Sequence, residues 1–81
     1  MKKRTFRLNA DANIFIVIDY NDVMTYPISS FYNGNPLYTS AYSKRQARYQ
    51  LLLKVCHDMA FPINRAYLEN YDIMEIINDE N

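Results

Sequence analysis

The stretch SKRQARYQLLLKVCHDMA, from Ser43 to Ala60, decides the fold because it is the only long segment with a clean helical period. Its apolar side chains recur at i, i+4, i+5, i+8, i+9 and i+12, which places them on one face of a helix. This apolar stripe consists of Ala47, Leu51, Leu52, Val55, Cys56 and Met59. A stripe of this width covers one face of a small sheet, so the sequence predicts one main helix packed against strands.

The ends of this helix are predicted from capping chemistry. Ser40 or Ser43 offers a hydroxyl to the free amides of the first turn. Phe61-Pro62 ends the helix, because the residue before proline is pushed out of the α region. Lys44 and Arg45 in the first turn oppose the helix dipole, at a cost of roughly a few tenths of a kcal/mol each.

Strand patterns precede the helix. Thr5 to Leu8 alternates between apolar and polar residues and predicts a short half-buried strand. Ile14 to Tyr20 is rich in β-branched and aromatic residues, which favours a central strand buried on both faces. Asn21-Asp22 favours a tight turn, after which Val23 to Tyr26 returns antiparallel. Pro27 cannot donate to a ladder, so this strand either ends there or lies at an edge.

Two further segments leave alternatives open. Between Ile28 and Ser40, Asn33-Gly34 is a hairpin signal within mixed patterns, and we expect a small hairpin or an ordered loop. Asn64 to Asn81 fits a second helix, with Tyr67, Tyr71, Met74 and Ile77 on one face. It also fits a short helical turn followed by a strand over Tyr71 to Ile77. We favour the strand, because the apolar strand before the helix needs neighbours. The last three residues are expected to fray.

These elements predict an α+β fold in a single domain, residues 1–81. A small antiparallel sheet of three to four strands is covered by the main helix, Ser43–Ala60, and a strand or second helix completes the C-terminal part. A chain of 81 residues is near the lower limit of what one hydrophobic core stabilises. A homo-oligomer is therefore one expected state.

The apolar runs and the cysteine content indicate a compartment. Ile14 to Ile18, the longest apolar run, is far too short to cross a membrane. Met1 to Arg4 carries the charge of a signal peptide, but no apolar region of the required length follows it. Cys56 is the only cysteine and forms no internal disulfide, which fits a reducing environment. The sequence thus predicts a soluble, cytoplasmic protein that does not contact a membrane.

No residue pattern predicts catalysis, a metal site or a cofactor. Cys56-His57-Asp58 contains the residue types of a catalytic triad, but adjacent helical residues point about 100° apart. Asp11, Asp19 and Asp22 match no calcium-binding loop, and turns explain two of them. Gly34 is the only glycine, so the chain has no glycine-rich phosphate loop. We therefore expect a protein that is not an enzyme.

Eight tyrosines without a tryptophan are the most unusual feature of the composition. Tyrosine joins a large apolar body to a polar tip, and it is enriched at protein interfaces. The predicted partner-binding residues, called here the tyrosine–basic patch, are Tyr38, Tyr42, Lys44, Arg45, Arg48 and Tyr49. The competing interpretation is that half of the tyrosines fill the edge of the core. We predict a protein–protein interaction module that binds through this patch.

Nucleic acid is the alternative partner. Tyrosine rings stack on bases and arginines contact phosphates, and Lys2, Lys3 and Arg4 could extend the same surface. However, nine basic and nine acidic residues give a formal net charge of zero, whereas nucleic-acid-binding domains are usually basic. The C-terminal segment is acidic and would repel a phosphate backbone.

The composition, short and rich in Asn, Ile and Tyr, resembles that of small accessory proteins of phages and mobile elements with AT-rich genomes. The resemblance lies in composition and involves no motif. It implies a protein that acts by occlusion, for example as an inhibitor of a host nuclease or immune complex.

Overall fold

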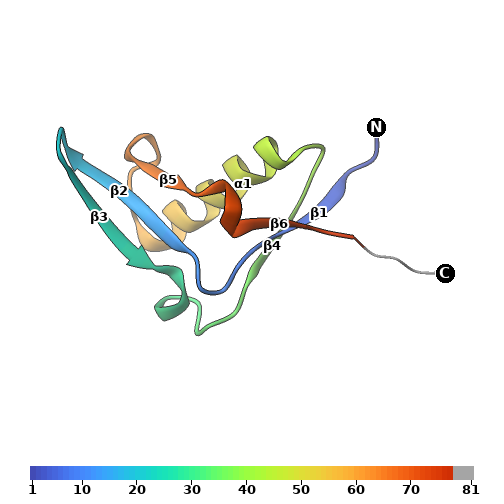
Figure 1. The fold of residues 1–81 in the computed structure, drawn as a ribbon, viewed down its shortest axis with the longest axis horizontal. Coiled ribbons are helices and arrows are strands. Elements are labelled where there is room, and N and C mark those ends of the chain that lie inside the picture. Colours follow the sequence, from blue (N-terminus) through green and yellow to red (C-terminus); the bar gives the residue numbers. More distant parts are fainter. Residues whose placement is uncertain (78–81) are drawn as a thin grey trace.

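The computed structural model describes residues 1–77 and has the predicted α+β class (Figure 1). In this part of the chain, one helix and six strands follow in the order β1 (Arg4–Leu8), β2 (Asn13–Asp19), β3 (Asp22–Pro27), β4 (Leu37–Ala41), α1 (Lys44–Met59), β5 (Ala66–Leu68) and β6 (Ile73–Ile76). Short 3-10 turns occupy Ile28–Ser30, Ile63–Arg65 and Asn70–Asp72. The strands form two antiparallel three-stranded sheets, ordered β4-β1-β6 and β3-β2-β5.

The two sheets meet at a corner where consecutive strands change direction. The central strands β1 and β2 are joined by residues 9–12, and the edge strands β5 and β6 are joined by residues 69–72. The Asn9 N–H donates to the carbonyl of Asp72 at 2.9 Å, which links these two bends. The Ile28 N–H donates to the carbonyl of Ala12 at 3.0 Å, and Ala12 is fully buried. Backbone hydrogen bonds therefore hold the corner together.

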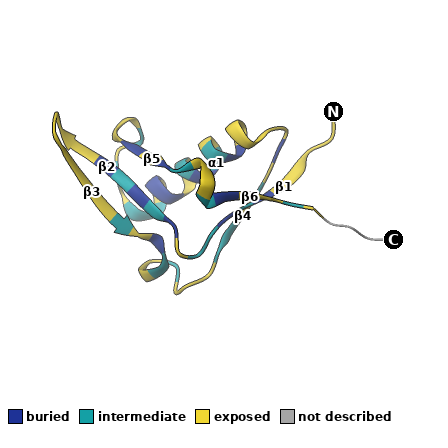
Figure 2. Cartoon of the chain, in the orientation of Figure 1, coloured by how far each residue is buried: buried dark blue, intermediate teal, exposed yellow. Residues whose placement is uncertain are grey.

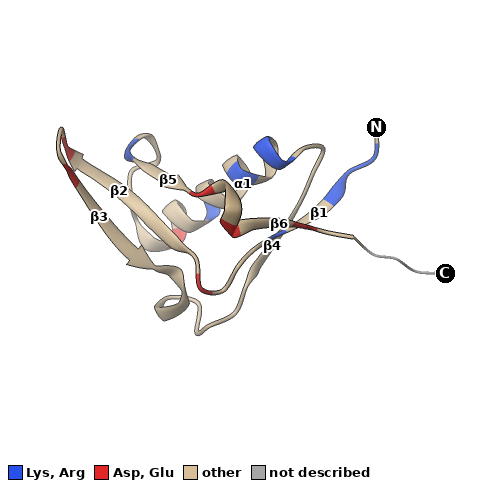
Figure 3. Cartoon of the chain, viewed as in Figure 1, with Lys and Arg blue, Asp and Glu red and all other residues tan. Residues whose placement is uncertain are grey.

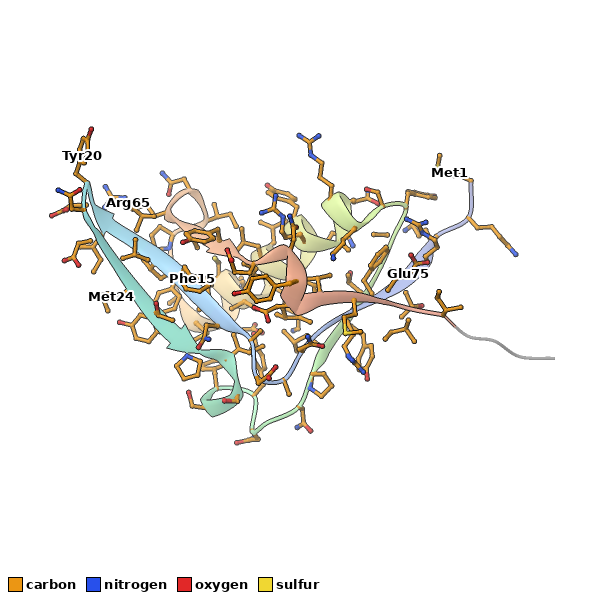
Figure 4. All side chains as sticks on the ribbon, viewed as in Figure 1. Met1, Phe15, Tyr20, Met24, Arg65 and Glu75 are labelled. Carbon is orange, nitrogen blue, oxygen red and sulfur yellow. The ribbon has the colours of Figure 1, made fainter. Side chains whose placement is uncertain are left out.

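The strand β2 is central, as predicted, but the prediction that both its faces are buried is wrong. Ile14 and Ile16 face the core, whereas Val17 and Ile18 are 37% and 38% exposed. The exposed part of β2 and β3 gathers toward the hairpin turn (Figure 2). The turn itself lies one residue earlier than predicted, and Tyr20 projects from its tip (Figure 4). A single helix covers one sheet face only, so the hairpin end remains uncovered.

The two ambiguous segments are resolved. Asn33 and Gly34 adopt left-handed backbone angles, with φ of 58° and 75°, in an ordered loop. This loop is not a hairpin, because β4 pairs with β1. For residues 64–77, which the structure describes, the helical alternative is wrong, and β6 confirms the predicted strand. The sequence did not predict β5, and the expectation of fraying at residues 79–81 lies outside the described residues.

The helix α1 begins at Ser43, whose Oγ accepts a hydrogen bond from the Gln46 N–H at 3.1 Å. Ser40, the alternative cap, lies in β4. The last helical residue is Met59, one before the predicted Ala60, because Ala60 adopts a left-handed conformation with φ of 61°. Of the apolar stripe, Ala47, Leu51, Val55 and Cys56 are buried, and Leu52 and Met59 are partly buried. Their partners in the core include Phe6, Leu8, Ile14, Leu68 and Ile73.

The packing of α1 gives a prediction with an internal control. Leu51 is 1% exposed, whereas Leu53 on the same helix is 41% exposed. Leu51→Ala should lower the free energy of unfolding by about 2–5 kcal/mol, because it leaves a cavity in the core. Leu53→Ala should change it by about 0.5 kcal/mol or less. Urea denaturation of both variants measures the difference, and equal losses would contradict the assigned helix orientation.

Candidate functional site

A groove runs between the first half of α1 and the strand β5. Its volume is about 490 Å³, and we call it the α1–β5 groove. Its lining residues are Ser43, Arg45, Gln46, Arg48, Tyr49, Leu52, Ala66 and Tyr67. On α1, Arg45, Tyr49 and Leu52 are spaced by four and three residues, which places them on one face of the helix. The groove is therefore bounded by one helical face and one strand.

A second hollow of about 370 Å³ adjoins this groove. It is lined by Lys44, Arg45, Arg48 and Asn70, so Arg45 and Arg48 line both hollows. Four residues of the tyrosine–basic patch are thus brought together: Lys44, Arg45, Arg48 and Tyr49. Their common surface continues from the start of α1 to the turn between β5 and β6.

Tyr38 does not belong to this surface. In β4 it lies opposite Arg7 of β1, which in turn lies opposite Met74 of β6. Neighbouring residues on β1, Phe6 and Leu8, are buried on the other face of the sheet, toward α1. Because strand residues alternate between faces, Tyr38 points away from the helix. Tyr38 therefore lies on a different surface from Lys44, Arg45, Arg48 and Tyr49.

Tyr42 lies at the N-terminal end of α1 with the basic N-terminal residues. The Lys3 ammonium is 5.6 Å from the centre of the Tyr42 ring. The Arg4 guanidinium donates to the carbonyl of Tyr42 at 3.2 Å, and the Tyr42 N–H donates to Gln46 Oε1 at 2.7 Å. Tyr42 is thus beside the α1–β5 groove and is not among its lining residues.

Two of the neighbouring cations, Arg4 and Lys54, form ion pairs, whereas the cations at the groove form none with the described residues. Arg4 pairs with Glu75 at 3.5 Å, and Lys54 pairs with Asp58 at 3.2 Å. Lys44, Arg45 and Arg48 form no ion pair with any residue from 1 to 77. The first turn of α1 holds no acidic residue either. Figure 3 shows the resulting cluster of Lys and Arg on the first half of α1.

Sequence reasoning missed the far wall of the groove. Ala66 and Tyr67 belong to β5, and Asn70 follows it. In the structure Ala66 and Leu68 are buried and Tyr67 is exposed, but Ala-Tyr-Leu shows no alternation of apolar and charged residues in the sequence. Three residues are too few for this pattern to stand out from a helix. Leu52 was assigned to the core stripe, and it both packs against the core and lines the groove.

The sequence Cys56-His57-Asp58 does not form a nucleophile and base. Cys56 is buried in the core, and this burial raises the pKa of its thiol. His57 Nδ1 lies 3.6 Å from Asp58 Oδ1, so these two side chains approach each other despite being adjacent. The stronger partner of Asp58 is Tyr32, whose hydroxyl donates to Oδ2 at 2.7 Å. These contacts connect the loop before β4 to the end of α1.

The pKa values of Tyr32 and Asp58, which share this hydrogen bond, are both shifted. Burial first, and then the hydrogen bond to Asp58, raise the pKa of Tyr32 far above its ordinary value of 10.0. The hydrogen bond from Tyr32, with help from Lys54, lowers the pKa of Asp58 below 3.8. A lowered carboxyl pKa stabilises the fold above pH 3.8, and this contribution is lost as the pH falls through the folded-state value.

The three aspartates Asp11, Asp19 and Asp22 do not gather at one point. Asp19 and Asp22 lie opposite each other at the hairpin end, whereas Asp11 lies before β2 at its other end. Across residues 1–77, no group of three His, Cys, Asp or Glu side chains is placed to hold a metal ion. No helix in the same range has the length and apolar character needed to cross a membrane.

The Tyr32–Asp58 contact gives a second prediction. Tyr32→Phe removes the donor to a carboxylate, and it should lower the free energy of unfolding at pH 7 by about 1 kcal/mol. The loss should shrink in acid below pH 3.8, as Asp58 becomes protonated. Tyr38→Phe, on an exposed tyrosine, serves as the control and should have no effect. Thermal unfolding across pH measures both, and a loss independent of pH would contradict the charged hydrogen bond.

Comparison of the chain with protein-family models, curated protein sequences and solved structures gives no match.

Proposed function

We propose that this protein is a non-enzymatic interaction module that binds a partner protein through the α1–β5 groove. The observation that carries the proposal is the meeting, in one groove, of Arg45, Arg48 and Tyr49 with the previously unassigned Tyr67. Inhibition of a host nuclease or immune complex by occlusion, which the resemblance to small phage and mobile-element proteins implies, belongs to the same proposal.

The charge of the groove supports an anionic partner surface. Three cations lie at the positive end of the helix dipole, and this arrangement destabilises the isolated helix slightly. Within residues 1–77 no carboxylate offsets them by an ion pair. Carboxylates of a partner would be attracted by both the side chains and the helix N-terminus. Arginine is well suited to this contact, because its planar group binds carboxylates through two parallel hydrogen bonds.

The apolar surface of the groove supports a macromolecule over a simple anion. Tyr49 is 57% exposed and Tyr67 is 37% exposed, and both line the groove together with Leu52. Tyrosine and arginine are the residue types that most often carry binding energy at protein interfaces. The combination of exposed rings and unpaired arginines is therefore typical of a protein-binding surface.

Nucleic acid remains the second candidate because of one specific contact. Lys3 lies over the ring of Tyr42, which brings the basic N-terminus to the start of α1. The basic surface is consequently larger than the sequence patch alone. Such a surface should bind single-stranded oligonucleotides with an affinity that falls steeply with salt.

Photo-crosslinking tests the groove directly. Tyr49 and Tyr38 are both 57% exposed but lie in different places, so they form a matched pair. A photoreactive phenylalanine analogue at position 49 should crosslink the partner, and the same group at position 38 should not. Loss of the crosslink in an Arg45→Glu, Arg48→Glu background would support the groove. Equal crosslinking from both positions would contradict the proposed site.

Alanine substitutions separate the groove from its surroundings. Arg45→Ala and Tyr49→Ala should each weaken partner binding by about tenfold or more, as expected of residues central to an interface. Tyr42→Ala should weaken it by about threefold or less, because Tyr42 lies outside the groove. Isothermal titration of the purified partner measures these affinities, and unchanged binding in the first two variants would refute the assignment.

An oligonucleotide titration tests the second candidate. Binding of single- and double-stranded oligonucleotides is measured at two salt concentrations, with Lys2→Gln, Lys3→Gln as the variant. Micromolar, salt-sensitive binding that this variant weakens would favour nucleic acid. Absence of such binding would leave the protein partner as the supported proposal.

A further inference from the structure

The α1–β5 groove follows the open edge of a sheet. β5 is the last strand of the sheet β3-β2-β5, and within residues 1–77 no strand pairs with its other side. Ala66 and Tyr67 are adjacent in β5 and point to opposite faces, yet both line the groove. Contact with two consecutive residues of an edge strand is expected of a groove that follows the free edge of that strand. The backbone of β5 therefore borders the groove.

This edge has the surroundings that an added strand needs. The opposite wall is the face of α1 that carries Arg45, Tyr49 and Leu52. An extended segment placed beside β5 would pair with its free backbone groups and have one face toward this helix. Peptides that add a strand gain affinity from main-chain hydrogen bonds and specificity from alternate side chains.

The two faces of such a segment meet different chemistry. Side chains directed toward α1 meet Arg45 and Arg48, which have no carboxylate partner within residues 1–77. Side chains directed to the other face lie beside Tyr67, whose ring stacks on that of Phe15 with 5.0 Å between the ring centres. Phe15 and Tyr67 are direct cross-strand neighbours, so they extend an apolar row that a third strand would continue.

The opposite edge of the same sheet lacks these features. β3, which forms that edge, begins with Asp22 and ends with Pro27, and it contains no lysine or arginine. Proline removes a backbone donor and limits strand pairing. We therefore expect an acidic segment to pair with the edge strand β5 and not with the edge strand β3.

We propose that the partner contributes an extended acidic segment that adds to β5 as a fourth strand. Its acidic side chains alternate with apolar ones, the acidic set facing Arg45 and Arg48 and the apolar set facing Tyr67. This inference rests on the proposed function, because it specifies the partner chemistry of the same groove.

A synthetic probe tests the proposal without knowledge of the natural partner. A fluorescein-labelled peptide, Glu-Val-Glu-Val-Glu-Val with blocked ends, is titrated with the full chain, and binding is followed by anisotropy. We expect a dissociation constant in the submicromolar to high-micromolar range. A Lys-Val analogue of the peptide should bind at least tenfold more weakly. Absence of binding at 1 mM protein, or equal binding of the two peptides, would overturn the proposal.

Two double variants of equal charge change locate the binding. Arg45→Gln, Arg48→Gln should weaken binding of the acidic peptide at least tenfold, whereas Lys2→Gln, Lys3→Gln should weaken it less than threefold. Both pairs remove two positive charges, so a general charge effect would act equally on them. Circular dichroism and thermal unfolding verify that each variant is folded. Equal weakening by the two variants would overturn placement in the groove.

Alternate N-methylation tests strand addition itself. An added strand directs every second amide toward β5, so methylating one alternate set should abolish binding and methylating the other should preserve it. In the complex, amide hydrogen exchange should slow within Ala66–Leu68. Equal loss in both methylated peptides, or unchanged exchange there, would overturn strand addition. A partner that crosslinks from position 49 would still support the proposed function after such a failure, so the two are tested separately.

Discussion

The fold depends on one constraint: a single helical stripe must cover two sheets. α1 has 16 residues and is about 24 Å long, whereas the molecule extends 49 Å along its longest axis. The sheets meet this constraint by joining at a corner, so that buried side chains of both sheets converge on the same stripe of α1. Hydrogen bonds from Asn9 to Asp72 and from Ile28 to Ala12 hold that corner. The hairpin of β2 and β3 reaches beyond the helix and remains exposed at its end.

The same constraint separates the two roles of α1. One face of the helix is buried in the core through Ala47, Leu51 and Val55, so these side chains are not accessible to a partner. The neighbouring face, with Arg45 and Tyr49, contacts no sheet face and borders the edge of β5 instead. Because the helix lies across the sheet corner, this second face is left with a strand edge on one side and solvent on the other. The groove is thus a by-product of how a short helix covers a bent sheet.

The sequence predicted the elements with strong local signals. The stripe of α1, one of its two candidate caps, Ser43, and the strands β1, β2 and β3 follow from periodicity and capping chemistry, and they were confirmed. β5 could not be predicted, because three residues carry too little periodicity and its stability comes from pairing with β2. The exposure of Val17 and Ile18 could not be predicted either, because the composition of a strand does not show how far the covering helix extends over it.

Prediction of the candidate site divides in the same way. Arg45, Arg48 and Tyr49 lie together in the structure because helical spacing alone brings them to one side of α1. Tyr38 was grouped with them by nearness in sequence, although the alternation of β4 sends it to the other sheet face. Tyr67 is 18 positions from Tyr49 and meets the groove only through the tertiary fold. Contacts within one helix could be foreseen, and contacts that depend on sheet pairing could not.

The burial of Cys56 makes the reactivity of its thiol a measure of local opening around α1. It is the single cysteine of the protein, it is 4% exposed, and burial raises the pKa of its thiol. Thiol reagents attack the exposed thiolate, so a folded molecule reacts only when α1 separates from the sheets. The labelling rate of the unmodified protein therefore measures how often the helix–sheet interface opens. A ligand that fastens α1 to the edge of β5 would slow that rate, which makes its effect on local opening visible without an engineered label.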